Sequence, residues 1–118
     1  MWVFTNFGFF SVVQHNKNSD SFLVRARSKD DLVRLILSYG EICNISANDI
    51  ITNHTADYLY RVEVNKSAWS KVISKISEDI DYYNFKDSVK DNLGSYRANL
   101  CNQVWSVMYD LQESENNL

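Results

Sequence analysis

The chain has 118 residues, of which 45% are hydrophobic, 23% charged and 14% aromatic. This is the composition of one folded domain, not of a disordered segment. No apolar run approaches the roughly 18 residues of a membrane span. The N-terminus lacks the basic start of a secretory signal, and the two cysteines form no disulfide framework. We therefore expect a soluble cytoplasmic protein with one domain over residues 1–112 and an acidic polar tail over residues 113–118.

The net charge of −3 is unevenly distributed along the chain. Residues 1–66 contain seven Lys or Arg and seven Asp or Glu, whereas residues 67–118 contain five and eight. Proteins that grip nucleic acid through its phosphates usually carry a basic excess. The charge therefore disfavours broad non-specific nucleic-acid binding, and it favours the first half of the chain for any anion-binding surface.

Residues 2–27 predict a β-hairpin. Residues 2–14 are rich in aromatic and β-branched side chains, which indicates a strand, and residues 5–8 are expected to interrupt it with a bulge or turn. The polar segment 15–20 then predicts a turn into a second strand over residues 22–27.

A helix is predicted to follow this hairpin. Ser28 and Asp31 resemble a capping box, so the helix should begin at Ser28. Gly40 is expected to end it, as a glycine commonly does at a helix C-terminus. The apolar positions of this helix fall at helical spacing: Leu32, Leu35, Ile36 and Tyr39.

Two strands and a second helix come next. Residues 49–54 predict a short strand, and the alternating segment 58–64 predicts another. Asn65 or Ser67 should cap the helix that follows. Its apolar stripe repeats at three and four: Trp69, Val72, Ile73, Ile76 and Ile80.

The C-terminal third of the chain predicts two more helices after a break at residues 81–84. Phe85 and Val89 suggest a short helix, and Gly94 is expected to separate it from a longer one over residues 96–112. The apolar side of the longer helix contains Leu100, Val104, Val107, Met108 and Leu111.

The predicted order of elements is β-β-α-β-β-α-α-α, which indicates an α+β fold. We expect a single-layer, mostly antiparallel sheet with the helices packed on one face, in a ferredoxin-like or permuted arrangement. Trp2, Trp69 and Trp105 are each expected to bury a large apolar area.

Alternation along the two clearest strands predicts a face that carries arginines. Side chains alternate across a strand, so Arg25 and Arg27 should share one face, as Arg61 and Glu63 should in the later strand. If the two strands are neighbours, the three arginines converge. Tyr58 and Tyr60, in the same alternation, are expected on the opposite, helix-covered face with the core residues Phe22, Val24, Ala26, Val62 and Val64.

Two interpretations of this arginine face stay open. In the first, the charges solvate an exposed face and Glu63 pairs with an arginine across the strands. In the second, Arg25, Arg27 and Arg61 bind an anion, because arginine presents a planar fork of donors that suits phosphate or carboxylate. The ligand would be a nucleotide, an RNA segment or an acidic protein surface.

The segment 81–86 (DYYNFK) is the most unusual stretch of the sequence. Asn84 and Lys86 are candidates for one rim of a binding pocket. The structural alternative is that Tyr82 and Phe85 join two helices while Asp81 or Asn84 caps the second of them.

The sequence contains no motif for catalysis, metal binding or a cofactor. Cys43 and His54 form only a weak nucleophile–base pairing, and the acids of residues 78–81 point in different directions if they are helical. Cys101 is expected to be a small core residue. We predict no catalytic residue, no metal and no cofactor.

Six segments together resemble a widespread family of small bacterial proteins. The resemblance covers nearly the whole chain in the right order, and it implies a stand-alone domain with no established activity, cofactor or partner. The segments are residues 2–5 (WVFT), 8–13 (GFFSVV), 24–27 (VRAR), 57–62 (DYLYRV), 81–86 (DYYNFK) and 104–108 (VWSVM).

Three functions are compatible with the sequence. The leading hypothesis is a non-enzymatic binding or regulatory module that binds an anionic ligand through its arginines. The second is a protein-interaction module or inhibitor that acts as a homodimer, with the last helix as the contact. The third is an enzyme whose site escapes motif reading. No membrane partner is expected.

Overall fold

The computed structural model describes residues 1–116 and contains, within them, five strands, four α-helices and a short 3-10 helix. The described chain forms two compact units, the first from Met1 to Asp81 and the second beginning at Tyr82. The sheet and the helices α1 and α2 belong to the first unit, and α3 and α4 belong to the second. The predicted α+β class is confirmed.

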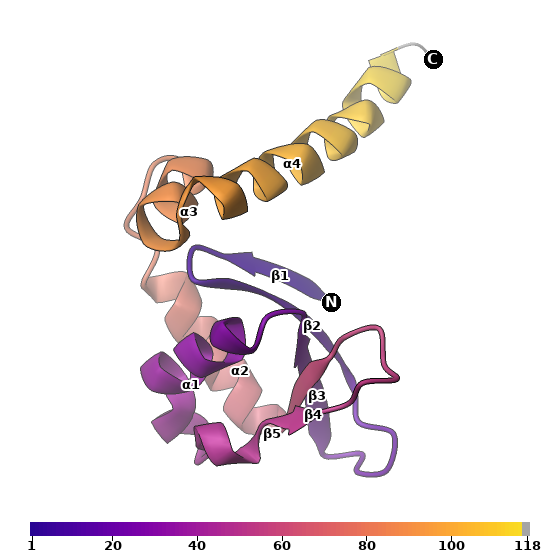
Figure 1. Ribbon diagram of the computed structural model, residues 1–118, viewed down its shortest axis with the longest axis vertical. Coiled ribbons are helices and arrows are strands. Elements are labelled where there is room, and N and C mark those ends of the chain that lie inside the picture. The colour runs from indigo at the N-terminus through magenta and orange to yellow at the C-terminus, as the bar shows by residue number, and fades with distance from the viewer. Residues whose placement is uncertain (117–118) are drawn as a thin grey trace. The chain divides into compact units, whose positions relative to one another are not determined.

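The strands of the first unit form one open sheet in which every neighbouring pair is antiparallel (Figure 1). They are β1 (Trp2–Thr5), β2 (Gly8–Gln14), β3 (Ser21–Ala26), β4 (Ile51–Thr52) and β5 (Tyr60–Asn65). Their order across the sheet is β1-β2-β3-β5-β4, so the chain leaves β3 and returns beside it as β5. The ferredoxin-like arrangement is compatible with this order and stays a prediction.

Helices α1 (Lys29–Cys43) and α2 (Lys66–Glu78) cover one face of the sheet, and a short 3-10 helix, η1 (Ala47–Asp49), follows α1 (Figure 1). The core between sheet and helices forms because the apolar stripe of each helix meets the apolar side of the strands. Its fully buried members include Phe10, Val24, Leu32, Val62 and Val72. The sheet face that α1 and α2 do not cover is called the open face below.

The first hairpin is tied to α1 by an aspartate that the sequence analysis assigned to a helix cap. The predicted interruption at residues 5–8 is the turn between β1 and β2. Asp31 is only 2% exposed, and its carboxylate accepts a hydrogen bond from the backbone N–H of Phe9 at 2.9 Å. Arg34 forms an ion pair with Asp31 and donates to the carbonyl of Phe7 at 2.7 Å. The capping-box prediction is wrong in this respect, because Asp31 faces the sheet instead of Ser28, which makes no side-chain cap.

Gly40 does not end α1, which continues to Cys43 and closes at Asn44 in a left-handed conformation with φ of 54°. Gly40 is needed for a different reason. A Cβ at this position would lie 2.9 Å from the carbonyl oxygen of Ile45. The glycine therefore allows the chain after the helix to fold back against it.

The second unit consists of α3 (Phe85–Leu93) and α4 (Ser95–Asn116), separated at Gly94 as predicted. Gly94 has φ of 94°, a conformation that favours glycine. Because α4 continues to Asn116, residues 113–116 of the predicted tail are helical, and residues 117–118 lie outside the described part. The predicted division at residue 112 stays a prediction.

The three tryptophans differ in burial. Trp69 is 3% exposed and belongs to the core, as predicted. Trp2 and Trp105 are 68% and 57% exposed, so the expectation that they are buried is wrong. Trp2 lies on the edge strand β1, which has a neighbour on one side only. Trp105 lies on α4, none of whose described residues is buried.

Candidate functional site

Arg25 and Arg61 lie directly opposite each other on the neighbouring strands β3 and β5. Their sequence neighbours Val24 and Val62 are buried in the core, so alternation directs both arginines to the open face. The adjacency of these strands, on which the predicted convergence depended, is therefore present. Arg27 follows β3 by one residue and joins the same group through Tyr58.

Tyr58 is the centre of this arginine cluster, which we define as Arg25, Arg27 and Arg61. The guanidinium carbon of Arg25 lies 4.6 Å from the centroid of the Tyr58 ring, and that of Arg27 lies 4.2 Å from it. The ring is 4% exposed. Guanidinium groups are attracted to the negative face of an aromatic ring, and the attraction strengthens when water is excluded.

The position of Tyr58 corrects the sequence prediction, which placed it on the helix-covered face. Strand β5 begins at Tyr60, so strand alternation does not extend to Tyr58. Tyr58 instead lies in the loop that precedes β5, where its backbone N–H donates to the Asp57 carboxylate at 2.9 Å. The aspartate before the tyrosine was the local signal for this turn. Tyr60 does pack against the core, as predicted.

Each arginine of the cluster donates one hydrogen bond to a neutral oxygen. Arg25 donates to the Ser11 hydroxyl at 2.7 Å. Arg27 and Arg61 donate to backbone carbonyls of the loop before β5, at 2.8 Å to Asp57 and at 2.9 Å to Tyr58. These bonds hold the loop against the open face. They leave the positive charges uncompensated, and each guanidinium retains further N–H donors.

No carboxylate of the described residues lies within 4.0 Å of the guanidinium nitrogens of the arginine cluster. The first of the two interpretations paired Glu63 with an arginine across the strands, and this pairing is wrong. Its carboxylate instead lies 3.3 Å from His15 Nε2 and accepts from the Asn18 side chain at 2.9 Å. Hydrogen bonds from Ser21 and Asn18 hold the pKa of Glu63 below its usual range.

Two donors of the cluster are both buried and without a hydrogen-bond acceptor within the described chain: Nε of Arg25 and Nε of Arg61. Like charges directly opposite each other on neighbouring strands repel, and a buried donor without an acceptor costs about 1–3 kcal/mol. The same two side chains carry both costs. An anion bound between the two guanidinium groups would offset the repulsion and accept from their N–H donors other than the buried Nε.

A row of aromatic side chains, which was not predicted from the sequence, adjoins the cluster on the open face. Phe9 stacks on Phe4 at 4.4 Å between ring centroids and meets the edge of Trp2 at 5.9 Å. On its other side Phe9 lies 6.4 Å from the Tyr58 ring. Alternation within residues 2–4, where the aromatic residues Trp2 and Phe4 are two apart, was the signal that could have revealed it.

Asn84 and Lys86 lie in the second unit, where each has a partner. The Asn84 side chain caps α3 by accepting from the backbone N–H of Asp87 at 3.0 Å, as the structural alternative predicted. The Lys86 ammonium donates to Asn102 at 3.2 Å and lies 4.8 Å from the centroid of the Trp105 ring. Their participation in a ligand site stays a prediction.

Two titratable side chains of α1, Tyr39 and Cys43, have raised pKa values. Tyr39 donates to Asp79 at 2.8 Å, and burial together with this bond raises the pKa of Tyr39 to about 12. Asp79, the C-cap of α2, also accepts from Lys75 at 2.9 Å. Because Tyr39 belongs to α1, its bond to Asp79 ties α1 to the end of α2. Burial raises the pKa of the Cys43 thiol, which lowers the thiolate fraction needed for nucleophilic attack.

Within the described residues, no three His, Cys, Asp or Glu side chains are grouped as a metal site would require. None of the described helices combines the length and apolar character needed to cross a membrane.

Comparison of the chain with protein-family models, with curated proteins and with solved structures found no match.

Proposed function

We propose that the first unit is a non-enzymatic binding module that holds an anionic ligand between Arg25 and Arg61. The observation that carries the proposal is the pairing of these two arginines across β3 and β5 with no carboxylate within 4.0 Å in the described chain. Arg27, held against the same Tyr58 ring, adds a third positive charge to the site.

The chemistry favours an oxyanion such as phosphate or carboxylate. A guanidinium offers parallel N–H donors that match two oxygens of one anion, and such charge-assisted bonds are roughly twice as strong as neutral ones. The neutral acceptors that now hold the cluster occupy only part of its donor capacity. An oxyanion therefore gains bonds here without breaking an ion pair.

The test is a calorimetric titration of the protein with sodium phosphate and sodium pyrophosphate, at low and at physiological salt. We expect saturable binding that the double variant Arg25→Gln/Arg61→Gln weakens by about tenfold or more, the equivalent of 1.4 kcal/mol. The matched control is Lys17→Ala/Lys71→Ala, which removes the same charge from two exposed positions of the same unit.

The proposal is refuted if neither anion binds the wild-type protein, or if the lysine control weakens binding as much as the arginine variant. Because the arginines also hold the loop before β5, each variant is first unfolded thermally. A variant with wild-type melting temperature and lost binding supports a ligand site. If the arginine variant binds the anions as tightly as the wild type but melts at a lower temperature, the arginines only stabilise the fold.

The alternative function, a homodimer formed through the last helix, has one specific observation in its favour. Leu100, Val104, Val107 and Leu111 of α4 repeat at four, three and four, the spacing of a two-stranded coiled-coil seam, and all four are exposed. The N-terminal part of α4 carries Arg97, and its C-terminal part carries Asp110, Glu113 and Glu115. An antiparallel pair of α4 helices would place opposite charges together.

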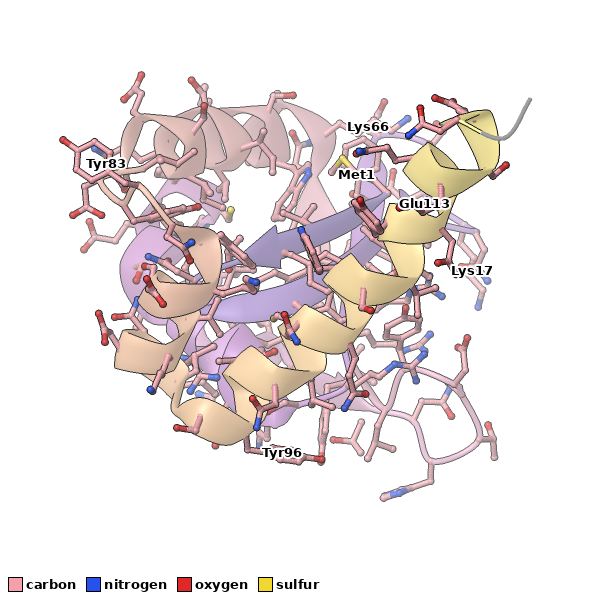
Figure 2. The ribbon with its side chains drawn as sticks, turned by 90° about the horizontal axis from the view of Figure 1, so that it is seen from above. Met1, Lys17, Lys66, Tyr83, Tyr96 and Glu113 are labelled. Carbon is pink, nitrogen blue, oxygen red and sulfur yellow. The ribbon has the colours of Figure 1, made fainter. Side chains whose placement is uncertain are left out.

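This alternative is tested by light scattering after size-exclusion chromatography across a range of protein concentrations. Figure 2 labels Tyr96 and Glu113, which lie toward opposite ends of α4. We expect Val107→Glu to shift a dimer to monomer, and Ser106→Glu, outside the seam, to leave it unchanged. A wild-type protein that is monomeric at every concentration refutes the homodimer.

The proposed module acts in the bacterial cytoplasm, where thiols stay reduced. Within the described residues neither Cys43 nor Cys101 forms a disulfide, as expected for that compartment. Its partner would be the anionic ligand itself, with no membrane involved.

A further inference from the structure

One line of side chains crosses three strand pairs of the open face from the sheet edge to the arginine cluster. Trp2 on β1 lies opposite Ser11 on β2, Ser11 lies opposite Arg25 on β3, and Arg25 lies opposite Arg61 on β5. Directly opposed residues of antiparallel strands share a face. The 2.7 Å bond from Arg25 to Ser11 and the contact of Trp2 with Phe9 confirm that these side chains are together on this face.

Trp2 differs from the other aromatic residues of the row. It is 68% exposed, whereas Phe4 and Phe9 are partly buried and Tyr58 is nearly covered by its neighbours. Its ring meets Phe9 edge to face with an interplanar angle of 85°, so Phe9 supports the ring from one direction only. An exposed indole held in this way is suited to stack on a planar ligand.

From this row we infer that the ligand of the arginine cluster is a nucleoside phosphate. Its phosphate binds between Arg25 and Arg61, and its base stacks on Trp2. The inference rests on the proposed anion-binding function and assigns the ligand class. Every nucleobase has an aromatic face, and stacking on a side chain depends little on which base is present.

The spacing of the row fits such a ligand. Neighbouring strands lie about 4.8 Å apart, so Trp2 and Arg25, two strands apart, are separated by about 10 Å at the backbone. Ser11, which lies opposite both residues on the intervening strand, has a small side chain, so no large side chain at that position stands between the indole and the guanidinium. A ligand with a planar ring at one end and phosphate at the other can contact both.

Charge argues for a single nucleotide instead of a long single strand. Residues 1–81 contain nine Lys or Arg and ten Asp or Glu, so the first unit carries no basic excess. Proteins that bind single strands without sequence preference combine stacking platforms with a positively charged groove that follows the backbone. Three clustered arginines on a nearly neutral unit can neutralise the few phosphate charges of one nucleotide, but they provide no basic groove for a longer strand.

The test compares adenosine triphosphate and uridine triphosphate with sodium triphosphate, which has the same phosphate chain but no base. We expect both nucleotides to bind at least about fivefold more tightly than triphosphate, the lower effect of one stacked base. Trp2→Ala should remove that difference and leave triphosphate binding unchanged. Trp2→Phe should preserve most of it, and Trp105→Ala, an exposed tryptophan of the second unit, should change nothing.

The possible outcomes distinguish failure of the nucleotide assignment from failure of the proposed anion site. Equal binding of nucleotide and triphosphate, both lost in Arg25→Gln/Arg61→Gln, would overturn the nucleotide assignment and leave the anion site standing. Absence of binding by all three ligands would overturn both. Oligothymidylate that binds far more tightly than either nucleotide, in a manner that depends on Trp2, would also overturn the assignment, in favour of a single strand.

Discussion

Replacing Asp31 by alanine tests how the sheet edge is held in place. The carboxylate is 2% exposed and accepts from the Phe9 N–H at 2.9 Å, while Arg34 joins it to the Phe7 carbonyl. The substitution leaves the Phe9 N–H without its acceptor and removes the charged partner of the Arg34 guanidinium, which keeps its bond to the Phe7 carbonyl. We expect the hairpin of β1 and β2 to loosen first, because these contacts tie it to α1.

The magnitude follows from the two losses. A buried N–H without an acceptor costs about 2 kcal/mol. Breaking a fully buried ion pair costs about 3–5 kcal/mol, but the Arg34 side chain is 35% exposed and water can replace most of that interaction. Adding about 1 kcal/mol for it gives a loss of about 3 kcal/mol. With an unfolding entropy of roughly 2.1 cal/mol/K per residue, a chain of 118 residues should then melt about 12 °C lower.

Thermal unfolding monitored by circular dichroism measures this loss, and Asp30→Ala is the matched control. Asp30 is the preceding residue in the same first turn of α1, has the same charge and is exposed. We expect the control to change the melting temperature by no more than about 2 °C, as is usual for a surface substitution. Equal losses for the two variants would refute the reasoning, since the effect would then come from charge at the helix start.

Two further predictions concern α1 and its surroundings. The pKa of Tyr39 is raised to about 12 by burial and by Asp79, so the neutral phenol is favoured in the folded state. The stability that this provides is complete below pH 10 and is lost as the pH rises towards 12. Tyr39→Phe should therefore show a smaller loss of melting temperature across that range than the wild type, and identical pH profiles would contradict this. Gly40→Ala should destabilise the fold by about 1–2 kcal/mol, because the alanine Cβ would lie 2.9 Å from the Ile45 carbonyl oxygen. This loss is opposite to the usual effect of alanine in a helix. A higher midpoint in urea unfolding for the variant would contradict the prediction.

Local patterns in the sequence were sufficient for much of the fold. Alternation in β3 and β5 separated the buried Val24 and Val62 from Arg25 and Arg61, because successive side chains of a strand point to opposite faces. The break at Gly94 was also readable. These features depend on residues only a few positions apart, so they can be predicted from the sequence alone.

The places where prediction failed involve partners far apart along the chain. Asp31 resembled part of a capping box because Ser28 precedes it by three residues, but its carboxylate accepts from the backbone N–H of Phe9, 22 residues away. Glu63 pairs with Asn18, 45 residues away, instead of with an arginine. Tyr58 seemed to continue the alternation of β5, although the strand begins two residues later.

The sequence by itself determined which residues form the sheet and helices and which arginines face away from the core. Only the tertiary structure decided that β3 and β5 are neighbours, that Arg25 and Arg27 both contact the Tyr58 ring, and that Trp2 aligns with Ser11 in the same row. The physical reason is that side-chain periodicity is a property of one segment, whereas strand order and register are set by which apolar faces α1 and α2 can bury together. The candidate site is made from four strands and a loop, and no single segment contains it.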